Sequence, residues 1–274
     1  MTTQRPSFPA RLDTASRVDT TPAAARAGFA IKKIASGAAL TVAGSLKYTP
    51  FRLPAGTGTD LSAVRLRMVA RLHAQGIENT VLLNALRAVE RHCFVDSALV
   101  SQAYEDTSLP IGLGQTISKP SVVARMVELL LQADNARTNG LGRVLEIGTG
   151  CGYQAAVLAQ VAKEVYSIER LRSLHEKARD NLRPFRLANV HLLLGDGMLG
   201  YDRGAPYAAI VAAAGGEALL QAWCDQLAVG GRLVAPMSAG GGRQVLMVVD
   251  KTPQGLVQRV LEEVLFVPLK SGIA

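Results

Sequence analysis

The sequence is poor in cysteine, in histidine and in long apolar runs. Cys93, Cys151 and Cys224 are its only cysteines, and they lie far apart without a Cys-x-x-Cys pair. This spacing argues against a disulfide framework and a structural zinc site, and it suits a reducing cytoplasm. The four histidines have no metal-ligand spacing, so we expect no metal. Because no apolar run reaches the roughly 18 residues that cross a membrane, we expect a soluble protein without a membrane partner.

Positive charge is in excess but unevenly placed. The net charge is +8, and residues 1–60 hold eight basic residues against three acidic ones. This segment is dominated by Ala, Thr, Ser, Pro, Gly and Arg without periodic apolar residues, so it cannot bury enough surface to offset the entropy of ordering. We interpret residues 1–60 as a flexible basic extension, a solvating tail in preference to a tether for an acidic partner. Residues 61–274 are then one folded domain.

The folded part is predicted to begin with two amphipathic helices. The first has an apolar stripe from Leu61 to Leu72 and ends at Gly76, and the second is capped by Asn79 or Thr80. These helices form a lid or a platform before the main sheet. A further helix with an apolar stripe is predicted to start at Pro120.

From Arg143 onward, short apolar strands alternate with helices. This alternation predicts a mostly parallel, doubly wound sheet with helices on both faces and an antiparallel finish. The expected strands are Val144–Ile147, Glu164–Ile168, Val190–Leu194, Tyr207–Ala212, Arg232–Ala235, Gln244–Asp250 and Val260–Val267, and the expected helices are Tyr153–Ala162, Leu171–Arg183 and Glu217–Leu227.

A glycine-rich turn follows the first of these strands. Gly148, Gly150 and Gly152 lie between an apolar strand and a helix, where glycine allows a ligand to approach the backbone closely. The spacing is G-x-G-x-G, whereas dinucleotide-binding proteins have G-x-G-x-x-G. The turn therefore argues against a standard NAD site.

Acidic residues follow the next two strands, at the sheet edge where ligands of open α/β folds bind. Glu169 lies 21 positions after Gly148, where a carboxylate can accept hydrogen bonds from ribose hydroxyls. Asp196, beside Gly197, can accept a bond from an adenine amino group. Each feature has a structural alternative, since Asp-Gly is a common turn and glycine turns occur in many α/β folds. Their order and spacing together predict a nucleoside ligand.

The motifs resemble those of a known family. Glu146 followed by the G-x-G-x-G turn resembles the first motif of S-adenosylmethionine-dependent methyltransferases. The segment from Leu109 to Pro120, which reads LPIGLGQTISKP, resembles the signature loop of protein-L-isoaspartate O-methyltransferases. Together with Gly195–Gly197 and Phe266–Leu269, the resemblance covers about residues 62–274. It implies the α/β fold of the class I methyltransferases, Rossmann-like and doubly wound, with a mostly parallel seven-stranded sheet and an N-terminal helical lid.

The resemblance also implies the activity and its residues. We expect S-adenosylmethionine as cofactor and methyl transfer to the free carboxylate of L-isoaspartyl residues in damaged proteins and peptides. Ser118 is the implied catalytic residue, although its spacing from Pro120 alone favours a helix cap, and both roles can coexist. The implied cofactor-binding residues are Thr116, Ile117, Ser118, Gly148, Gly150, Gly152, Glu169, Asp196, Gly197 and Gln244. Ala212 departs from the family, which usually has a threonine there.

The expected chemistry demands no general base. An isoaspartyl carboxylate has a pKa of about 4, so it is already ionised at neutral pH. A nucleic-acid methyltransferase would share the fold, but its Asn/Asp-Pro-Pro-aromatic and Pro-Cys motifs are missing, so no nucleic acid is expected. The other alternative is an inactive cofactor-binding relative that acts as a partner-binding module. The sequence leaves open the oligomeric state, for which a monomer is the expectation, and the identity of the repaired proteins.

Overall fold

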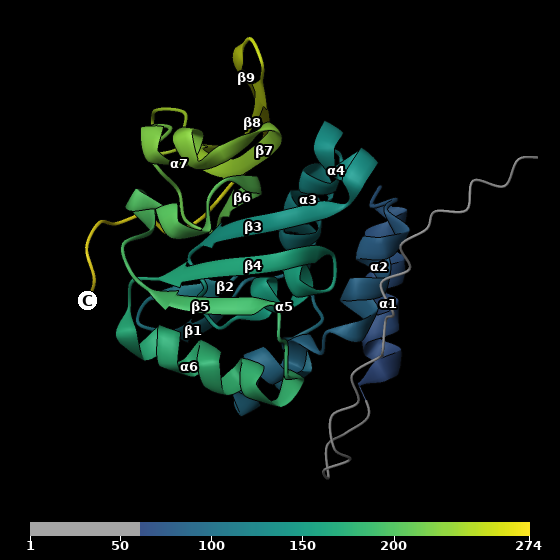
Figure 1. Ribbon diagram of the computed structural model, residues 1–274. Helices are drawn as coiled ribbons and strands as arrows, with labels where there is room; N and C mark the ends of the chain where they lie inside the picture. The colour runs from purple at the N-terminus through teal and green to yellow at the C-terminus, as the bar shows by residue number, and fades with distance from the viewer. Residues whose placement is uncertain (1–60) are drawn as a thin grey trace, which may run out of the picture. The chain divides into compact units, whose positions relative to one another are not determined.

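The computed structural model describes residues 61–274 (Figure 1). The predicted extension, residues 1–60, lies outside the described residues. None of the helices in the described part is long and apolar enough to span a membrane.

The described part of the chain begins with the two predicted helices, α1 (Ser62–Ala74) and α2 (Thr80–Ala88). Gly76 follows α1 with a φ of 100°, and the Asn79 side chain caps α2 by accepting a hydrogen bond from the Leu82 backbone N–H at 3.1 Å. Both helices pack against α3 (Pro120–Leu131). Neither contributes a residue to the cleft described below, so their packing is that of a platform.

A small antiparallel hairpin precedes α3 in a segment where the sequence indicated only a loop. It joins β1 (Leu109–Gly112) to β2 (Gln115–Ile117), after two 3₁₀ helices, η1 (Arg91–Phe94) and η2 (Ser97–Gln102). Its two turn residues, Leu113 and Gly114, have φ values of 53° and 69°. Positive φ at both positions is typical of the type I′ turn that suits a two-residue hairpin loop. The hairpin places β2 directly before α3.

The main sheet has seven strands in the order β5-β4-β3-β6-β7-β8-β9. The strands from β5 to β7 are parallel, whereas β8 is antiparallel to both β7 and β9. The mostly parallel sheet and its antiparallel finish are therefore confirmed. The strands are β3 (Leu141–Ile147), β4 (Ala162–Glu169), β5 (Val190–Leu194), β6 (Tyr207–Ala212), β7 (Leu227–Ser238), β8 (Gln244–Thr252) and β9 (Gly255–Val264).

Helices cover both faces of the sheet, because successive strand residues point to opposite sides. On β3, Val144 belongs to a core shared with α1, α2, α3 and α5, while Leu145 belongs to a second core with Trp223 of α7. The remaining helices are α4 (Asp134–Asn139), α5 (Tyr153–Ala159), α6 (Arg172–Leu182) and α7 (Gln221–Gln226), with 3₁₀ turns η3 (Arg183–Phe185), η4 (Gly197–Leu199) and η5 (Asp202–Gly204). In Figure 1 the arrowheads of β3, β4 and β5 point to one edge, and the C-terminal end lies on that side.

Most element boundaries differ from the prediction by a few residues, and three of these differences have a structural reason. The helix expected over Glu217–Leu227 begins only at Gln221, because Gly215 and Gly216 form β-bridges with Pro268 and Met237. The helix after the glycine turn ends at Ala159 to leave room for β4. The last strand, expected over Val260–Val267, runs instead from Gly255 to Val264, since a tight turn starts a hairpin with β8.

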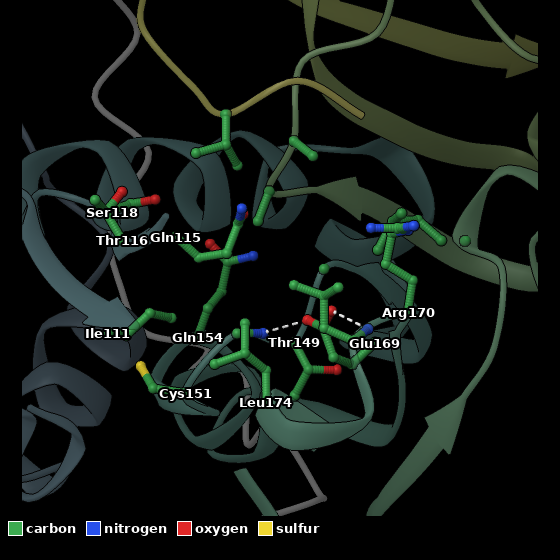
Figure 2. A pocket seen from close by; sticks show the side chains of 18 of the residues that line it. Ile111, Gln115, Thr116, Ser118, Thr149, Cys151, Gln154, Glu169, Arg170 and Leu174 are labelled. Carbon is green, nitrogen blue, oxygen red and sulfur yellow. Dashed lines mark hydrogen bonds between the residues drawn. The ribbon is translucent and has the colours of Figure 1, made fainter. Parts of the chain in front are cut away.

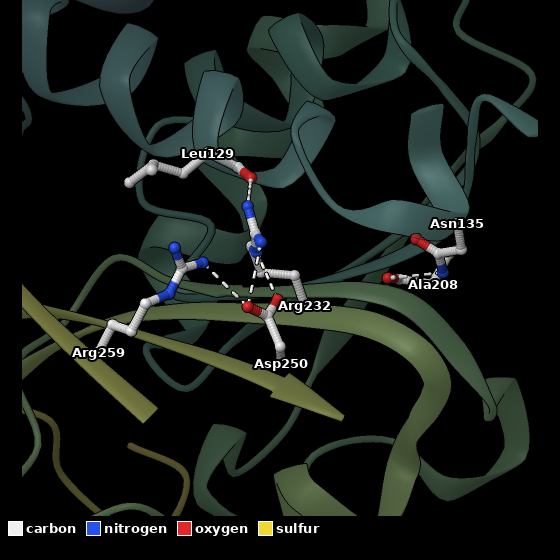
Figure 3. A network of polar contacts seen from close by, with 6 residues as sticks. All are labelled: Leu129, Asn135, Ala208, Arg232, Asp250 and Arg259. Carbon is white, nitrogen blue, oxygen red and sulfur yellow. Dashed lines mark hydrogen bonds and ion pairs between the residues drawn. The ribbon is translucent and has the colours of Figure 1, made fainter. Parts of the chain in front are cut away.

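A partly buried ion-pair network joins the antiparallel part of the sheet to α3 (Figure 3). Arg232 on β7 donates from Nε and Nη2 to the two carboxylate oxygens of Asp250 on β8, at 2.6 and 3.1 Å. Its Nη1 donates to the Leu129 carbonyl at 2.9 Å. Arg259 on β9 adds a bond to Asp250 at 2.9 Å. One carboxylate thus holds three strands in register, and Arg232 fixes them to the helix that follows the hairpin.

Candidate cofactor and active site

A cleft of about 900 Å³, partly open to solvent, lies at the carboxyl edge of the parallel strands. This edge is where open α/β sheets bind ligands. Its wall comes from the hairpin and the start of α3, the glycine turn, the start of α6, the residues after β6 and the segment after β9. The polar or charged residues of this lining are Gln115, Thr116, Ser118, Thr149, Tyr153, Gln154, Glu169, Arg170 and Lys270.

The glycine turn is as tight as its sequence predicts. The Gly148 N–H donates to the Ile168 carbonyl at 2.8 Å, which ties the end of β3 to β4. Gly152 precedes α5 with a φ of 92°, and a Cβ there would lie 3.0 Å from the Leu182 side chain. Gly148 and Gly150 line the cleft, whereas Gly152 is outside its lining and shapes the turn from behind.

Glu169 is held rigidly at the end of β4. Its two carboxylate oxygens accept the backbone N–H groups of Gly150 and Leu171, both at 2.9 Å (Figure 2). The residue is only 5% exposed yet lines the cleft. A carboxylate has about four acceptor sites, so two remain for a ligand. Glu169 therefore links the glycine turn to the start of α6 and still presents acceptors to ribose-like hydroxyls.

Ser118 lies on another part of the wall, half-buried and beside Thr116 and Ile117. The helix-cap role considered for it is not found. The N-cap of α3 is Lys119, which makes no side-chain cap bond, and the Ser121 N–H is satisfied by the Asp106 carboxylate. Ser118 makes no side-chain hydrogen bond within residues 61–274. Figure 2 shows Thr116 and Ser118 on one side of the cleft, Glu169 and Arg170 on the other, and Gln154 between them.

The structure does not bring Asp196 or Gln244 into the cleft lining, although Gly197 is part of it. Asp196 accepts the Met198 N–H at 2.9 Å and the Gly272 N–H at 2.6 Å. The Gln244 amide makes a pair of bonds with the backbone of Phe266, at 2.7 and 3.2 Å. Gln244 thus fixes the chain where it leaves β9, which is a structural role.

Sequence reasoning missed two cations of the cleft, Arg170 and Lys270. Arg170 follows Glu169 directly, and Lys270 follows the Phe266–Leu269 motif, so their positions beside recognised residues were the available signal. The departure at Ala212 affects a fully buried residue outside the cleft lining. The cleft wall at that strand end is made by Ala213 and Ala214 instead.

A chain of buried hydroxyls connects the cleft to Glu146. Thr149, which lines the cleft, lies 2.6 Å from the Ser167 hydroxyl, and Ser167 donates to Glu146. Glu146 is completely buried, and this burial raises its pKa to about 8, against the smaller lowering effects of Ser167 and Gln154. Within residues 61–274, one oxygen of Glu146 and the Gln154 amide nitrogen have no hydrogen-bond partner. Burial behind the glycine turn therefore favours the neutral form of the Glu146 carboxyl group.

The comparisons with known proteins decide the family. The model of the protein-L-isoaspartate(D-aspartate) O-methyltransferase family matches residues 64–274. This chain belongs to that family. A protein-L-isoaspartate O-methyltransferase of Methylibium petroleiphilum is 61% identical, over 80% of this chain and 81% of the relative.

Solved structures show the same fold. A protein-L-isoaspartate O-methyltransferase structure superposes with a TM-score of 0.68 at 29% identity, over 76% of this chain and 67% of the other. A Plasmodium falciparum protein in complex with S-adenosyl-L-homocysteine has a TM-score of 0.65 at 22% identity. The match covers 75% of this chain and 98% of the other. The predicted class I methyltransferase fold and the family resemblance are both confirmed.

Proposed function

We propose that this protein transfers a methyl group from S-adenosylmethionine to the free carboxylate of L-isoaspartyl residues in damaged proteins. The observation that carries the proposal is the position of Ser118. Its hydroxyl has no partner in the described part of the chain and lies in the same cleft as the Glu169–Gly150 unit. A carboxylate-orienting donor and a nucleoside site therefore share one cavity.

The residues present fit the cofactor. Glu169 keeps free acceptor sites for ribose hydroxyls, and the backbone of Gly148 and Gly150 forms part of the wall without side chains. Thr116, Ile117 and Gly197 complete the surroundings. Asp196 acts at the rim of the cleft, beside Gly197. When bound, S-adenosylmethionine supplies a methyl group activated by the positive charge of its sulfur.

The protein's own contribution is alignment. The substrate carboxylate is ionised at neutral pH, so no side chain has to remove a proton. Ser118 would donate a hydrogen bond to one carboxylate oxygen and leave the other oxygen free to accept the methyl group that the bound cofactor would supply. The products are a methyl ester and S-adenosylhomocysteine. Holding the reacting groups in line can supply about 7–11 kcal/mol of the barrier reduction.

Several properties of the whole protein belong to the same proposal. Residues 61–274 act as the methyltransferase domain and residues 1–60 as a basic extension. The protein acts in the cytoplasm, as a monomer, on isoaspartyl proteins and peptides, without nucleic acid or membrane partners. Its three free cysteines support a reducing compartment.

The test compares two peptides that differ only in one linkage. Labelled S-adenosylmethionine is incubated with the protein and an isoaspartyl peptide, or with its normal aspartyl twin. Transfer to the isoaspartyl peptide alone is the expected result. Cofactor binding without labelling of either peptide would favour an inactive, partner-binding relative.

A further inference from the structure

The segment after β9 crosses the cleft from one side to the other. We call residues 267–274 the strap. Near its start, the Gly215 N–H donates to the Val267 carbonyl and the Leu269 N–H donates to the Gly215 carbonyl, both at 2.8 Å. Gly215 follows β6, so this pair of bonds anchors the strap on the β6 side of the cleft.

The far end of the strap is bound on the opposite side, after β4 and β5. The Gly272 N–H donates to Asp196 at 2.6 Å, and the Ala274 N–H donates to the Arg170 carbonyl at 2.9 Å. In the sheet order, β3 lies between β6 and β4, and its glycine turn forms part of the cleft wall. The strap therefore spans the cleft above this turn, and its residues from Val267 to Lys270 line the cavity.

Arg170 is the side chain that fastens the strap from the β4 side. Its Nε donates to the Gly272 carbonyl at 3.0 Å, and its Nη2 donates to the Ser271 carbonyl at 3.3 Å. The four residues from Ser271 to Ala274 are all exposed. An exposed segment held by a few hydrogen bonds opens more readily than a buried one. The anchor at Gly215 can stay closed while the fastened end opens.

Asp196 connects the strap to the expected nucleoside site. The Asp196 carboxylate, which we expect to accept a bond from the adenine amino group, also accepts the Gly272 N–H. The same residue therefore takes part in closing the strap and in binding the nucleoside. Gly197, the next residue, lines the cleft. When the strap is fastened, its residues from Val267 to Lys270 form part of the wall around a nucleoside in the cleft.

We propose that Arg170 is a positioning residue that holds the strap across the cofactor cleft, and that the strap must open for the cofactor to exchange. The proposal rests on the proposed function only for the identity of the ligand. Its direct consequence is kinetic, because Arg170 then controls how fast S-adenosylhomocysteine leaves after methyl transfer.

The experiment measures the dissociation rate of S-adenosylhomocysteine, which needs no methyl acceptor. Trp223 is the single tryptophan, and its Nε1 donates to the Gly197 carbonyl at 2.8 Å, so its emission reports on that part of the cleft. Displacement of bound S-adenosylhomocysteine by an excess of labelled S-adenosylmethionine gives the same dissociation rate independently. Arg170→Ala is expected to raise the dissociation rate about tenfold without lowering the melting temperature by more than a few degrees.

Two variants make the test specific. Arg172→Ala removes an arginine side chain two positions away. That side chain is exposed and makes no side-chain hydrogen bond within residues 61–274. The dissociation rate of S-adenosylhomocysteine in this variant is therefore expected to equal that of the parent. Deletion of residues 271–274 also removes the Asp196 and Ala274 contacts, so it is expected to raise the rate at least as much as Arg170→Ala does. Combining the two changes should raise the rate no further than the deletion alone, because the deletion already removes both acceptors of the Arg170 side chain.

The outcomes separate the two proposals. An unchanged dissociation rate in Arg170→Ala overturns the role of the strap. An additive effect of Arg170→Ala and the deletion also overturns it, because it would mean that Arg170 contacts the cofactor directly. Failure of the parent protein to bind S-adenosylhomocysteine would instead overturn the proposed function.

Discussion

The carboxylate of Asp106 accepts a hydrogen bond from the backbone N–H of Ser121 at 2.9 Å. This contact satisfies a free N–H at the start of α3 from outside the helix, and it explains why Ser118 does not serve as the cap. The two interpretations of Ser118, cap or active-site donor, are thereby separated. Asp106 stabilises the helix, and the hydroxyl of Ser118 stays available to the cleft.

Ser118→Ala should slow methyl transfer and leave cofactor affinity nearly unchanged. Loss of a hydrogen bond to a charged carboxylate costs about 1.5–3 kcal/mol, which corresponds to a decrease in kcat/KM of roughly 10- to 150-fold. Steady-state kinetics with an isoaspartyl peptide and calorimetric titration with S-adenosylhomocysteine measure the two effects. Unchanged turnover would remove Ser118 from the reaction.

Asp106→Ala should lower the free energy of unfolding by about 1 kcal/mol, because α3 loses the acceptor for one of its first N–H groups. Urea denaturation measures this change. Asp106→Asn is the matched control, since its amide oxygen can still accept the Ser121 N–H, and it should retain most of the stability. Equal loss in both variants would mean that the charge, and not the cap bond, is what matters.

Glu169→Ala should weaken cofactor binding by roughly 1.5–3 kcal/mol, the range for hydrogen bonds to a charged acceptor. Part of this loss arises indirectly, because the Gly150 and Leu171 N–H groups lose their acceptor and the glycine turn loosens. Titration with S-adenosylhomocysteine gives the dissociation constant. Glu169→Gln keeps one acceptor oxygen and should fall between the parent and the alanine variant; an unaltered constant in Glu169→Ala would exclude Glu169 from the ribose site.

The features that sequence reasoning predicted depend on residues that are close together in the sequence. The apolar strand before Gly148, the glycine-rich turn after it and the acid at the end of the next strand are local patterns, and all three appear where expected. Parallel pairing then follows from strand and helix alternation, because each crossover returns the next strand in the same direction.

What sequence reasoning missed depends on contacts between distant residues. The Asp106 cap lies 15 positions before its partner, and Asp196 lies 76 positions before Gly272. The Asp-Gly pair is compatible with a ligand site or with a turn. No residue near Asp196 in the sequence indicates that the strap binds to it. Gln244 was assigned to the cleft by resemblance, but its partner Phe266 is visible only once β8 and β9 are paired.

Asp250→Ala should destabilise the fold by about 3 kcal/mol, because it leaves the buried guanidinium of Arg232 without its paired charge. Arg259→Ala removes the other, more exposed partner of the same carboxylate and should cost less than about 1 kcal/mol. Thermal and urea denaturation compare the two variants. Similar losses in both would show that the network acts through the outer pair, contrary to the burial of Arg232.

Glu146→Gln should flatten the pH dependence of stability. The ordinary pKa of a glutamate is 4.5, whereas burial raises that of Glu146 to about 8. As the pH rises through this window, the unfolded chain gains the free energy of ionisation while the folded protein keeps its proton, so stability falls between about pH 4.5 and pH 8.

Glutamine is nearly isosteric, stays neutral and can still accept the Ser167 hydroxyl. The free energy of unfolding without cofactor, measured in urea at pH 5 and pH 8, should therefore drop further in the parent than in the variant. Other titrating groups are common to both proteins, so parallel profiles would show that Glu146 is ionised in the folded state at neutral pH.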